Sequence, residues 1–106
     1  MSDWIDVITE SALAEGEHVV VDVDGSDVAV FKTADGIYAV QDVCTHDGAE
    51  IASGRLEGND IICPRHGAKF CLKTGAVLRG PAYEALACFP LRVAAGVIQV
   101  RDGRWD

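Results

Sequence analysis

The sequence is poor in positive charge and in long apolar runs. It has 9 basic against 17 acidic residues and a formal net charge of -8. Nucleic acids and anionic membrane surfaces repel an acidic protein, so both are excluded as partners. No apolar run is long enough to span a membrane, and the first residues lack the basic start and apolar core of a signal peptide. We therefore expect a cytoplasmic protein.

Cysteine is also scarce, with four residues in the chain. In a reducing compartment, cysteines spaced near histidines indicate metal binding rather than a disulfide framework. Cys71 and Cys88 do not belong to a closely spaced Cys/His pair. We expect these two to be free thiols that serve as small core side chains.

The length of 106 residues favours one domain over 1–106 and leaves no room for a second catalytic domain. Repeats, linkers and low-complexity segments are absent, as is the G-x-G-x-x-G fingerprint of a nucleotide-binding reductase. Charge is unevenly distributed: residues 1–54 carry -11 with Lys32 as their single basic residue, and residues 55–106 carry +3. Such a dipole would orient docking at a charged partner.

Short β-branched runs separated by glycine-containing turns predict an all-β domain of antiparallel strands. The Asp24-Gly25, Gly58-Asn59 and Ala95-Gly96 pairs are typical of tight hairpins. A single helical turn at 11–15 is the most helix that the sequence favours. The predicted strands are 19–23, 28–31, 37–41, 56–57, 60–62, 69–72, 91–93 and 97–100.

The strongest signal is a pair of short motifs. Cys44-Thr45-His46 is followed, after sixteen residues, by Cys63-Pro64-Arg65-His66. Two thiolates and two imidazoles are the ligands that a Rieske-type [2Fe-2S] centre requires, with two Cys on one iron and two His on the other. Because each pair mixes the two ligand types, each loop would contact both irons, and neither loop alone could hold the cluster.

Two other readings of the four residues remain open. They could be buried thiols and satisfied histidines that fell at these positions by chance. They could also bind a structural zinc ion, which accepts two Cys and two His. Common zinc motifs pair like with like, C-x2-4-C and H-x3-5-H, whereas both pairs here are mixed.

The C-T-H and C-P-R-H-G segments, with the neighbouring K-F-C-L-K-T-G run, resemble the Rieske-type ferredoxins of aromatic-ring-hydroxylating dioxygenase systems. The resemblance implies a Rieske-like antiparallel β-sandwich with a small cluster-binding subdomain, roughly 43–83. It implies one [2Fe-2S] cluster, held by Cys44 and Cys63 on the inner iron and by His46 and His66 on the outer iron. Gly80-Pro81-Ala82 would correspond to a third loop that covers the cluster.

One departure separates the chain from the respiratory branch of the family, whose ligand loops carry an additional disulfide. Ala49 and Arg65 occupy those positions here. Relatives without that bridge are low-potential ferredoxins, so we expect a potential near the bottom of the Rieske range of about -150 to +300 mV.

By the same resemblance, the chain is a monomeric electron carrier rather than an enzyme. The oxygenases of these systems add a mononuclear iron held by two His and a carboxylate. The chain has three His, of which the cluster would use two. Its expected partners are a flavoprotein ferredoxin reductase, which draws on NAD(P)H, and the terminal oxygenase. A monooxygenase ferredoxin, a nitrite reductase small subunit and a zinc-stabilised interaction module remain as alternatives.

Overall fold

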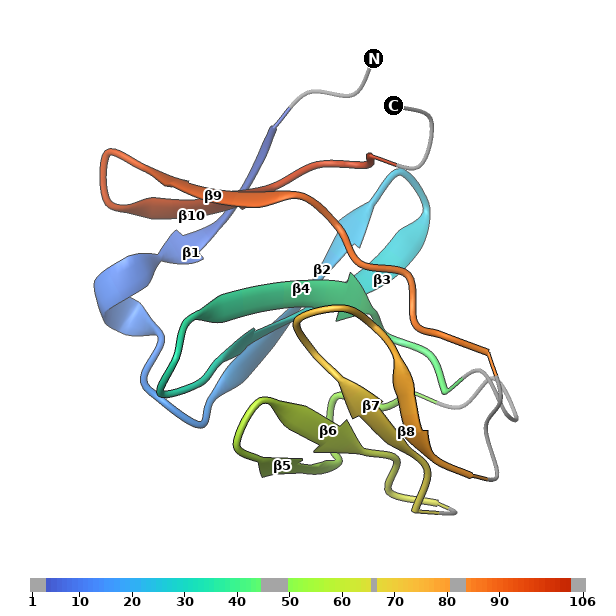
Figure 1. Ribbon diagram of the computed structural model, residues 1–106. Helices are drawn as coiled ribbons and strands as arrows, with labels where there is room; N and C mark the ends of the chain where they lie inside the picture. Colours follow the sequence, from blue (N-terminus) through green and yellow to red (C-terminus); the bar gives the residue numbers. More distant parts are fainter. Residues whose placement is uncertain (1–3, 45–49, 66, 81–83, 104–106) are drawn as a thin grey trace.

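The computed structural model describes residues 4–44, 50–65, 67–80 and 84–103, which form three antiparallel sheets (Figure 1). Their orders are β1-β10-β9, β2-β3-β4 and β5-β6-β7-β8. The strands are β1 (Ile5–Thr9), β2 (His18–Val23), β3 (Ser26–Lys32), β4 (Ile37–Gln41), β5 (Arg55–Glu57), β6 (Asp60–Ile62), β7 (Lys69–Cys71), β8 (Val77–Arg79), β9 (Leu91–Ala94) and β10 (Val97–Val100).

Helix is confined, in the described part of the chain, to one 3-10 turn, η1 (Glu10–Ala12). The sequence placed a helical turn one residue later, at 11–15. No helix in the described ranges is long and apolar enough to cross a membrane. The predicted all-β class with antiparallel strands is confirmed.

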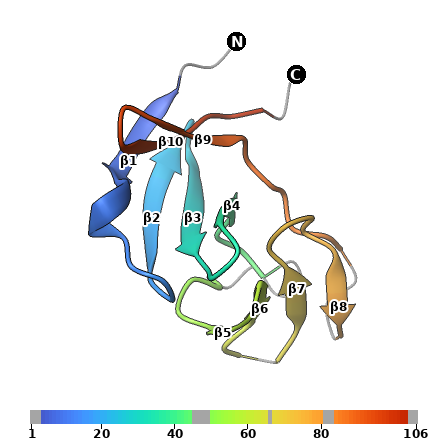
Figure 2. The ribbon, with the colours of Figure 1, turned by 60° about the vertical axis from the view of Figure 1, so that its left-hand side comes forward.

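The first two sheets form a sandwich. Side chains from both of them, and from the segment that precedes β9, meet in one apolar core, which we call the sandwich core. The third sheet lies on the other side of the middle sheet, away from β9 and β10 (Figures 1 and 2). The buried members of the sandwich core are Leu13, Val23, Val28, Val30, Ala39, Phe89, Ile98 and Val100.

The middle sheet is covered on both faces. Along β3, Val28 and Val30 point into the sandwich core, whereas Ala29 and Phe31 point into a second core shared with the third sheet. Successive side chains of a strand point to opposite faces, so a strand buried on both faces carries an unbroken apolar run. The second core contains Ala29, Phe31, Val40, Cys44, Ile51, Ala52, Ile61, Cys63, Ala68, Phe70, Leu72 and Leu86.

Two of the predicted hairpin turns have the backbone that their sequences favour. Asp24 and Gly25 have φ of 51° and 86°, and Ala95 and Gly96 have 53° and 80°. Two successive positive φ values define the type I′ turn, whose twist matches that of the flanking strands. These turns fix the registers in which Val23 pairs with Ser26 and Ala94 pairs with Val97.

Two strands were not predicted. β1 pairs with β10 in a register that shifts between Asp6 and Ile8, and β8 pairs with β7 in a register that shifts between Lys69 and Phe70. Both lie at the edge of their sheet. An irregular edge strand is held by pairing with its neighbour, which a local sequence pattern does not record.

Candidate metal centre

Two of the four predicted ligands are described, and they lie in the same core. Cys44 follows β4 and Cys63 follows β6, with exposed fractions of 0% and 1%. Both belong to the second core, and neither forms a disulfide. The prediction that these two thiols lie close enough to bind one iron therefore agrees with their shared place in the fold. The other two predicted ligands, His46 and His66, lie outside the described residues.

The first ligand loop is closed at its base by Asp42. Oδ1 of Asp42 accepts the backbone N–H groups of Ile51 and Ala52, each at 2.9 Å. The Asp42 N–H itself donates to the Asp27 carbonyl at 2.8 Å. One carboxylate thus holds the two ends of the segment that contains Cys44 and anchors that segment to the start of β3.

The second ligand loop is a tight turn between β6 and β7. The Cys63 N–H donates to the Ala68 carbonyl at 2.7 Å, and the Gly67 N–H donates to the Cys63 carbonyl at 3.1 Å. Gly67 has φ of 76°, a conformation that glycine adopts at little cost.

The segment assigned to a third loop begins at the end of β8. Gly80, directly after Arg79, is exposed. Pro81 and Ala82 lie outside the described residues. The expectation that this loop covers a cluster therefore stays a prediction.

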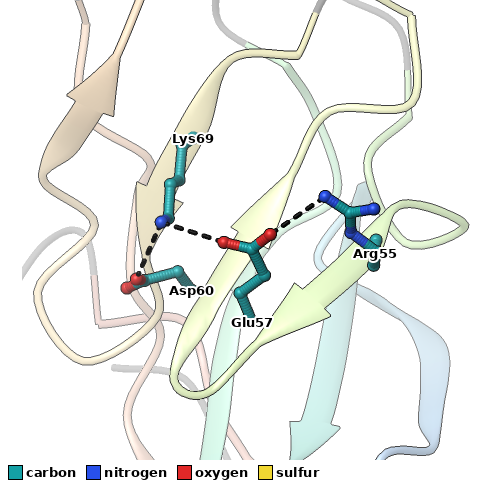
Figure 3. A network of polar contacts seen from close by, with 4 residues as sticks. All are labelled: Arg55, Glu57, Asp60 and Lys69. Atoms are coloured by element: carbon teal, nitrogen blue, oxygen red, sulfur yellow. Dashed lines mark hydrogen bonds and ion pairs between the residues drawn. The ribbon is translucent and has the colours of Figure 1, made fainter.

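Charged side chains on the outer face of the third sheet neutralise one another (Figure 3). Glu57 accepts a hydrogen bond from Lys69 at 3.1 Å and from Arg55 at 2.9 Å, and Lys69 also lies 3.7 Å from Asp60. The pKa of Glu57 is lowered, first by the hydrogen bond and charge of Lys69 and then by Arg55. The positive charge that follows the second ligand pair in sequence is thus partly compensated within the sheet.

A second polar network joins the middle sheet to the third sheet. The Thr33 hydroxyl, 6% exposed, donates to Asn59 Oδ1 at 2.6 Å, and Asn59 Nδ2 donates to Asp35 at 2.6 Å. Lys73 lies 3.6 Å from the same Asp35 carboxylate. The pKa of Asp35 is lowered by the hydrogen bond from Asn59 first and by the charge of Lys73 second. This network therefore helps to fix the orientation of the third sheet relative to the sandwich.

The prediction that Cys71 and Cys88 are core side chains is wrong. Cys71 is half-buried and Cys88 is exposed, although both are free thiols as expected. Phe70 and Leu72, the neighbours of Cys71, fill the second core instead. His18 lies on β2, opposite Phe31, with ring centroids 5.7 Å apart, which agrees with a surface or pairing role.

Among the described ranges, no three His, Cys, Asp or Glu side chains gather as a metal site. The two predicted imidazole ligands, His46 and His66, lie outside these ranges. The described thiols nonetheless fit an iron-sulfur centre, because they lie unbridged in one apolar core and cysteine thiolates are the ligands of the sulfur-bound iron.

Comparison with known families gives a clear result over most of the chain. Residues 3–90 match the model of the Rieske [2Fe-2S] domain. The chain belongs to the Rieske [2Fe-2S] family. A domain of this family holds one cluster of the Rieske type, so the predicted cofactor is confirmed at the level of the family.

Curated relatives place the chain among Rieske ferredoxins. It is 33% identical over 90 residues to the ferredoxin component of the naphthalene 1,2-dioxygenase system of Pseudomonas putida, covering 85% of this chain and 86% of the relative. It is 39% identical over 85 residues to the 3-phenylpropionate/cinnamic acid dioxygenase ferredoxin subunit of Escherichia coli K12, covering 79% of each. The predicted kinship with ferredoxins of aromatic dioxygenase systems is thereby confirmed.

Solved structures agree. A complex of reduced oxygenase and oxidised ferredoxin in carbazole 1,9a-dioxygenase contains a chain with a TM-score of 0.88 and 33% identity, covering 92% of both chains. A putative NADH-dependent nitrite reductase small subunit from Mycobacterium tuberculosis has a TM-score of 0.83 and 30% identity, covering 94% of this chain and 95% of that one. The Rieske fold is therefore shared with both kinds of protein.

Proposed function

We propose that this Rieske protein carries single electrons from an NAD(P)H-dependent flavoprotein reductase to the terminal oxygenase of a multicomponent aromatic-ring-hydroxylating dioxygenase. It would do so as a monomer in the cytoplasm. The observation that carries the proposal is the burial of Cys44 and Cys63 in one core of a chain whose curated relatives are dioxygenase ferredoxins. The carbazole complex of oxygenase and ferredoxin supports the oxygenase as one partner.

We assign the cluster to Cys44 and Cys63 on one iron and to His46 and His66 on the other, within residues 43–83 of a single domain. The bound cluster supplies one-electron redox chemistry. The role of the chain is to hold it rigidly and to exclude water from the thiolate side. Burial of both thiols, the Asp42 clasp on the first loop and the tight second loop support this assignment.

A role as carrier, rather than oxygenase, follows from the small ligand inventory. The chain has three histidines, and the proposed cluster uses two of them. The third, His18, lies on β2, an edge strand of the middle sheet. One histidine does not supply the two that a mononuclear iron site of the oxygenase type needs. The curated relatives, of which the chain covers 86% and 79%, are a ferredoxin component and a ferredoxin subunit of dioxygenase systems, which supports an electron carrier.

The ligand assignment is tested on the purified protein by visible absorption and, after dithionite reduction, by electron paramagnetic resonance. We expect a red-brown protein with a Rieske-type signal, lost on His46→Ser or His66→Ser and retained on His18→Ser. Cluster retention in either ligand variant would contradict the assignment. A colourless folded protein that contains zinc would support the zinc-stabilised module instead.

The partner assignment is tested by reconstitution. Cytochrome c reduction should depend on the ferredoxin and on a flavoprotein reductase with NADH or NADPH, and oxygenase turnover should require all three components. Nitrite reduction in a parallel assay tests the second candidate, which the likeness to a putative nitrite reductase small subunit favours. Activity with nitrite reductase and none with the oxygenase would overturn the dioxygenase role.

A further inference from the structure

Two cysteines outside the proposed ligand set lie at the turn between β7 and β8, close enough for the charge of Cys71 to act on Cys88. The Gly75 N–H in that turn donates to the Cys71 carbonyl at 2.7 Å. A Cβ placed on Gly75 would lie 3.2 Å from Cys88 Sγ. Two backbone interactions hold the segment that carries Cys88 in this place. The Leu86 N–H donates to the Gly75 carbonyl at 2.8 Å, and Cys88 forms an isolated antiparallel β-bridge with Val40. Gly75 therefore contacts the backbone of Cys71 and lies beside the sulfur of Cys88.

Both of these thiols are accessible where the proposed ligands are not. Cys71 is half-buried and Cys88 is exposed, whereas Cys44 and Cys63 are 0% and 1% exposed. A small oxidant in solution therefore reaches the turn before it reaches the second core. Oxidation of a cysteine follows both its exposure and its thiolate character.

The two thiols differ in reactivity. The pKa of Cys71 is lowered, above all by a hydrogen bond with the Thr74 side chain; burial opposes this, and backbone N–H groups of Thr74 and Lys73 add to the lowering. The pKa of Cys88 is raised, first by burial of its sulfur against the turn and then by the charge of Cys71. A larger fraction of Cys71 than of Cys88 is therefore thiolate, which makes Cys71 the better nucleophile. The negative charge of the Cys71 thiolate also disfavours ionisation of Cys88.

We propose that Cys71 and Cys88 form a second redox site, independent of the cluster, in which a peroxide converts the dithiol reversibly to a disulfide. The Cys71 thiolate attacks one oxygen of hydrogen peroxide; an S–O bond forms, the O–O bond breaks and the hydroxide leaves as water after protonation. Cys88 then attacks the Cys71 sulfur; the S–S bond forms, the S–O bond breaks and a second water leaves with the Cys88 proton. Two electrons pass from the two thiols to the peroxide.

The position of the bond gives it a structural consequence. It would join the two ends of the segment 72–87, which contains β8 and the exposed Gly80 after it. The absence of a Gly75 side chain leaves room for the Cys88 sulfur at the turn, since a Cβ there would contact Cys88 Sγ and overlap the Leu86 carbonyl. Oxidation would therefore constrain the segment that borders the second core at Leu72 and Leu86.

The test uses the cluster-containing protein, exposed to low hydrogen peroxide while its visible absorption is followed, then blocked with N-ethylmaleimide and digested with trypsin. Cleavage after Lys and Arg leaves each cysteine in its own peptide: 33–55, 56–65, 70–73 and 80–92. We expect peptides 70–73 and 80–92 to appear cross-linked while the visible absorption is retained, and to separate with dithiothreitol.

Two variants make the test specific. Cys88→Ser should abolish the cross-link and leave Cys71 trapped by dimedone as its sulfenic acid adduct, and Cys71→Ser should give neither product. Maleimide on both cysteines after peroxide treatment would overturn the proposal. A cross-link found only in covalent dimers would also overturn it. The same holds if peptides 33–55 and 56–65 become cross-linked with loss of colour while peptides 70–73 and 80–92 do not.

Discussion

The Thr33 hydroxyl donates a 2.6 Å hydrogen bond to Asn59 Oδ1, although 26 positions separate the two residues in the sequence. Thr33 follows β3 at its turn into β4, and Asn59 lies in the turn between β5 and β6. The contact therefore joins the sandwich to the third sheet. Asn59 also donates to Asp35, and its own carbonyl accepts the Leu72 N–H at 2.8 Å, so one residue ties together two turns and the end of β7.

Replacing Asn59 with alanine should lower the free energy of unfolding by about 0.5–1.5 kcal/mol, because the Thr33 hydroxyl loses its 2.6 Å acceptor and is left with the Gly36 carbonyl at 3.3 Å. Gln99→Ala is the matched control, because it removes an amide whose two hydrogen bonds, with Asp6 and Arg92, are exposed. It should change the free energy of unfolding by no more than about 0.5 kcal/mol. Urea unfolding measures both. Equal losses in the two variants would contradict a joining role for Asn59.

Replacing Asp42 with alanine should detach the base of the first ligand loop. Two hydrogen bonds to a charged acceptor are lost, each worth about 1.5–3 kcal/mol, and we expect lower stability and lower cluster content. Asp42→Asn keeps an acceptor oxygen and should recover much of both. The measurements are urea unfolding and visible absorbance per mole of protein. An alanine variant with unchanged cluster content would rule out the positioning role.

Acidification should weaken the third sheet through Glu57. Lys69 and Arg55 hold the folded pKa of Glu57 below its ordinary 4.5. The unfolded chain therefore binds this proton more readily than the folded one, so the stabilisation is present above about pH 4.5 and is lost as the pH falls through the lowered folded value. Glu57→Gln should show a shallower acid limb in stability measured against pH.

The control for that experiment is Glu15→Gln, an exposed residue beyond η1 with no ion pair among the described contacts. It should keep the acid limb of the parent protein. If Glu57→Gln and the parent lose stability in parallel below pH 4.5, the ion pairs of Figure 3 contribute nothing measurable, as holds for many exposed pairs.

Gly75 and Gly58 provide a matched pair for the cost of a side chain at positive φ. Gly58→Ala, with φ of 61° and open space around it, should cost about 1–2 kcal/mol for the left-handed backbone alone. Gly75→Ala, with φ of 79°, would also place Cβ 2.2 Å from the Leu86 carbonyl oxygen and should cost about 4 kcal/mol or more. Thermal unfolding, or the yield of folded protein, compares them; similar losses would refute the packing argument.

Strands flanked by tight-turn sequences were predictable, and the two edge strands with shifted registers, β1 and β8, were not. Asp24-Gly25 and Ala95-Gly96 marked tight turns in the sequence, and the hairpins that they close matched the prediction. β1 depends on β10, almost a full chain length away, and its register shifts between Asp6 and Ile8. No local pattern encodes such a pairing.

The candidate site divides in the same way. The spacing of Cys44 and Cys63 relative to the two histidines indicated a Rieske centre, and the family match bears this out at the level of the domain. The residues that hold the loops were not predicted as such. Asn59 was considered only as a turn residue, and nothing in the sequence marks Asp42 as an anchor, because their partners lie 26 and 9 positions away.

The sequence by itself determined the spacing of the Cys and His residues, the antiparallel all-β class and the positions of the tight hairpin turns, since each depends on residues close together in the chain. The tertiary structure alone decided which cysteines are buried. Alternation along a strand places Phe70 and Cys71 on opposite faces, but the covering of one face by the second core depends on sheets distant in sequence. For that reason Cys63 lies in the core and Cys88 at the surface beside Gly75.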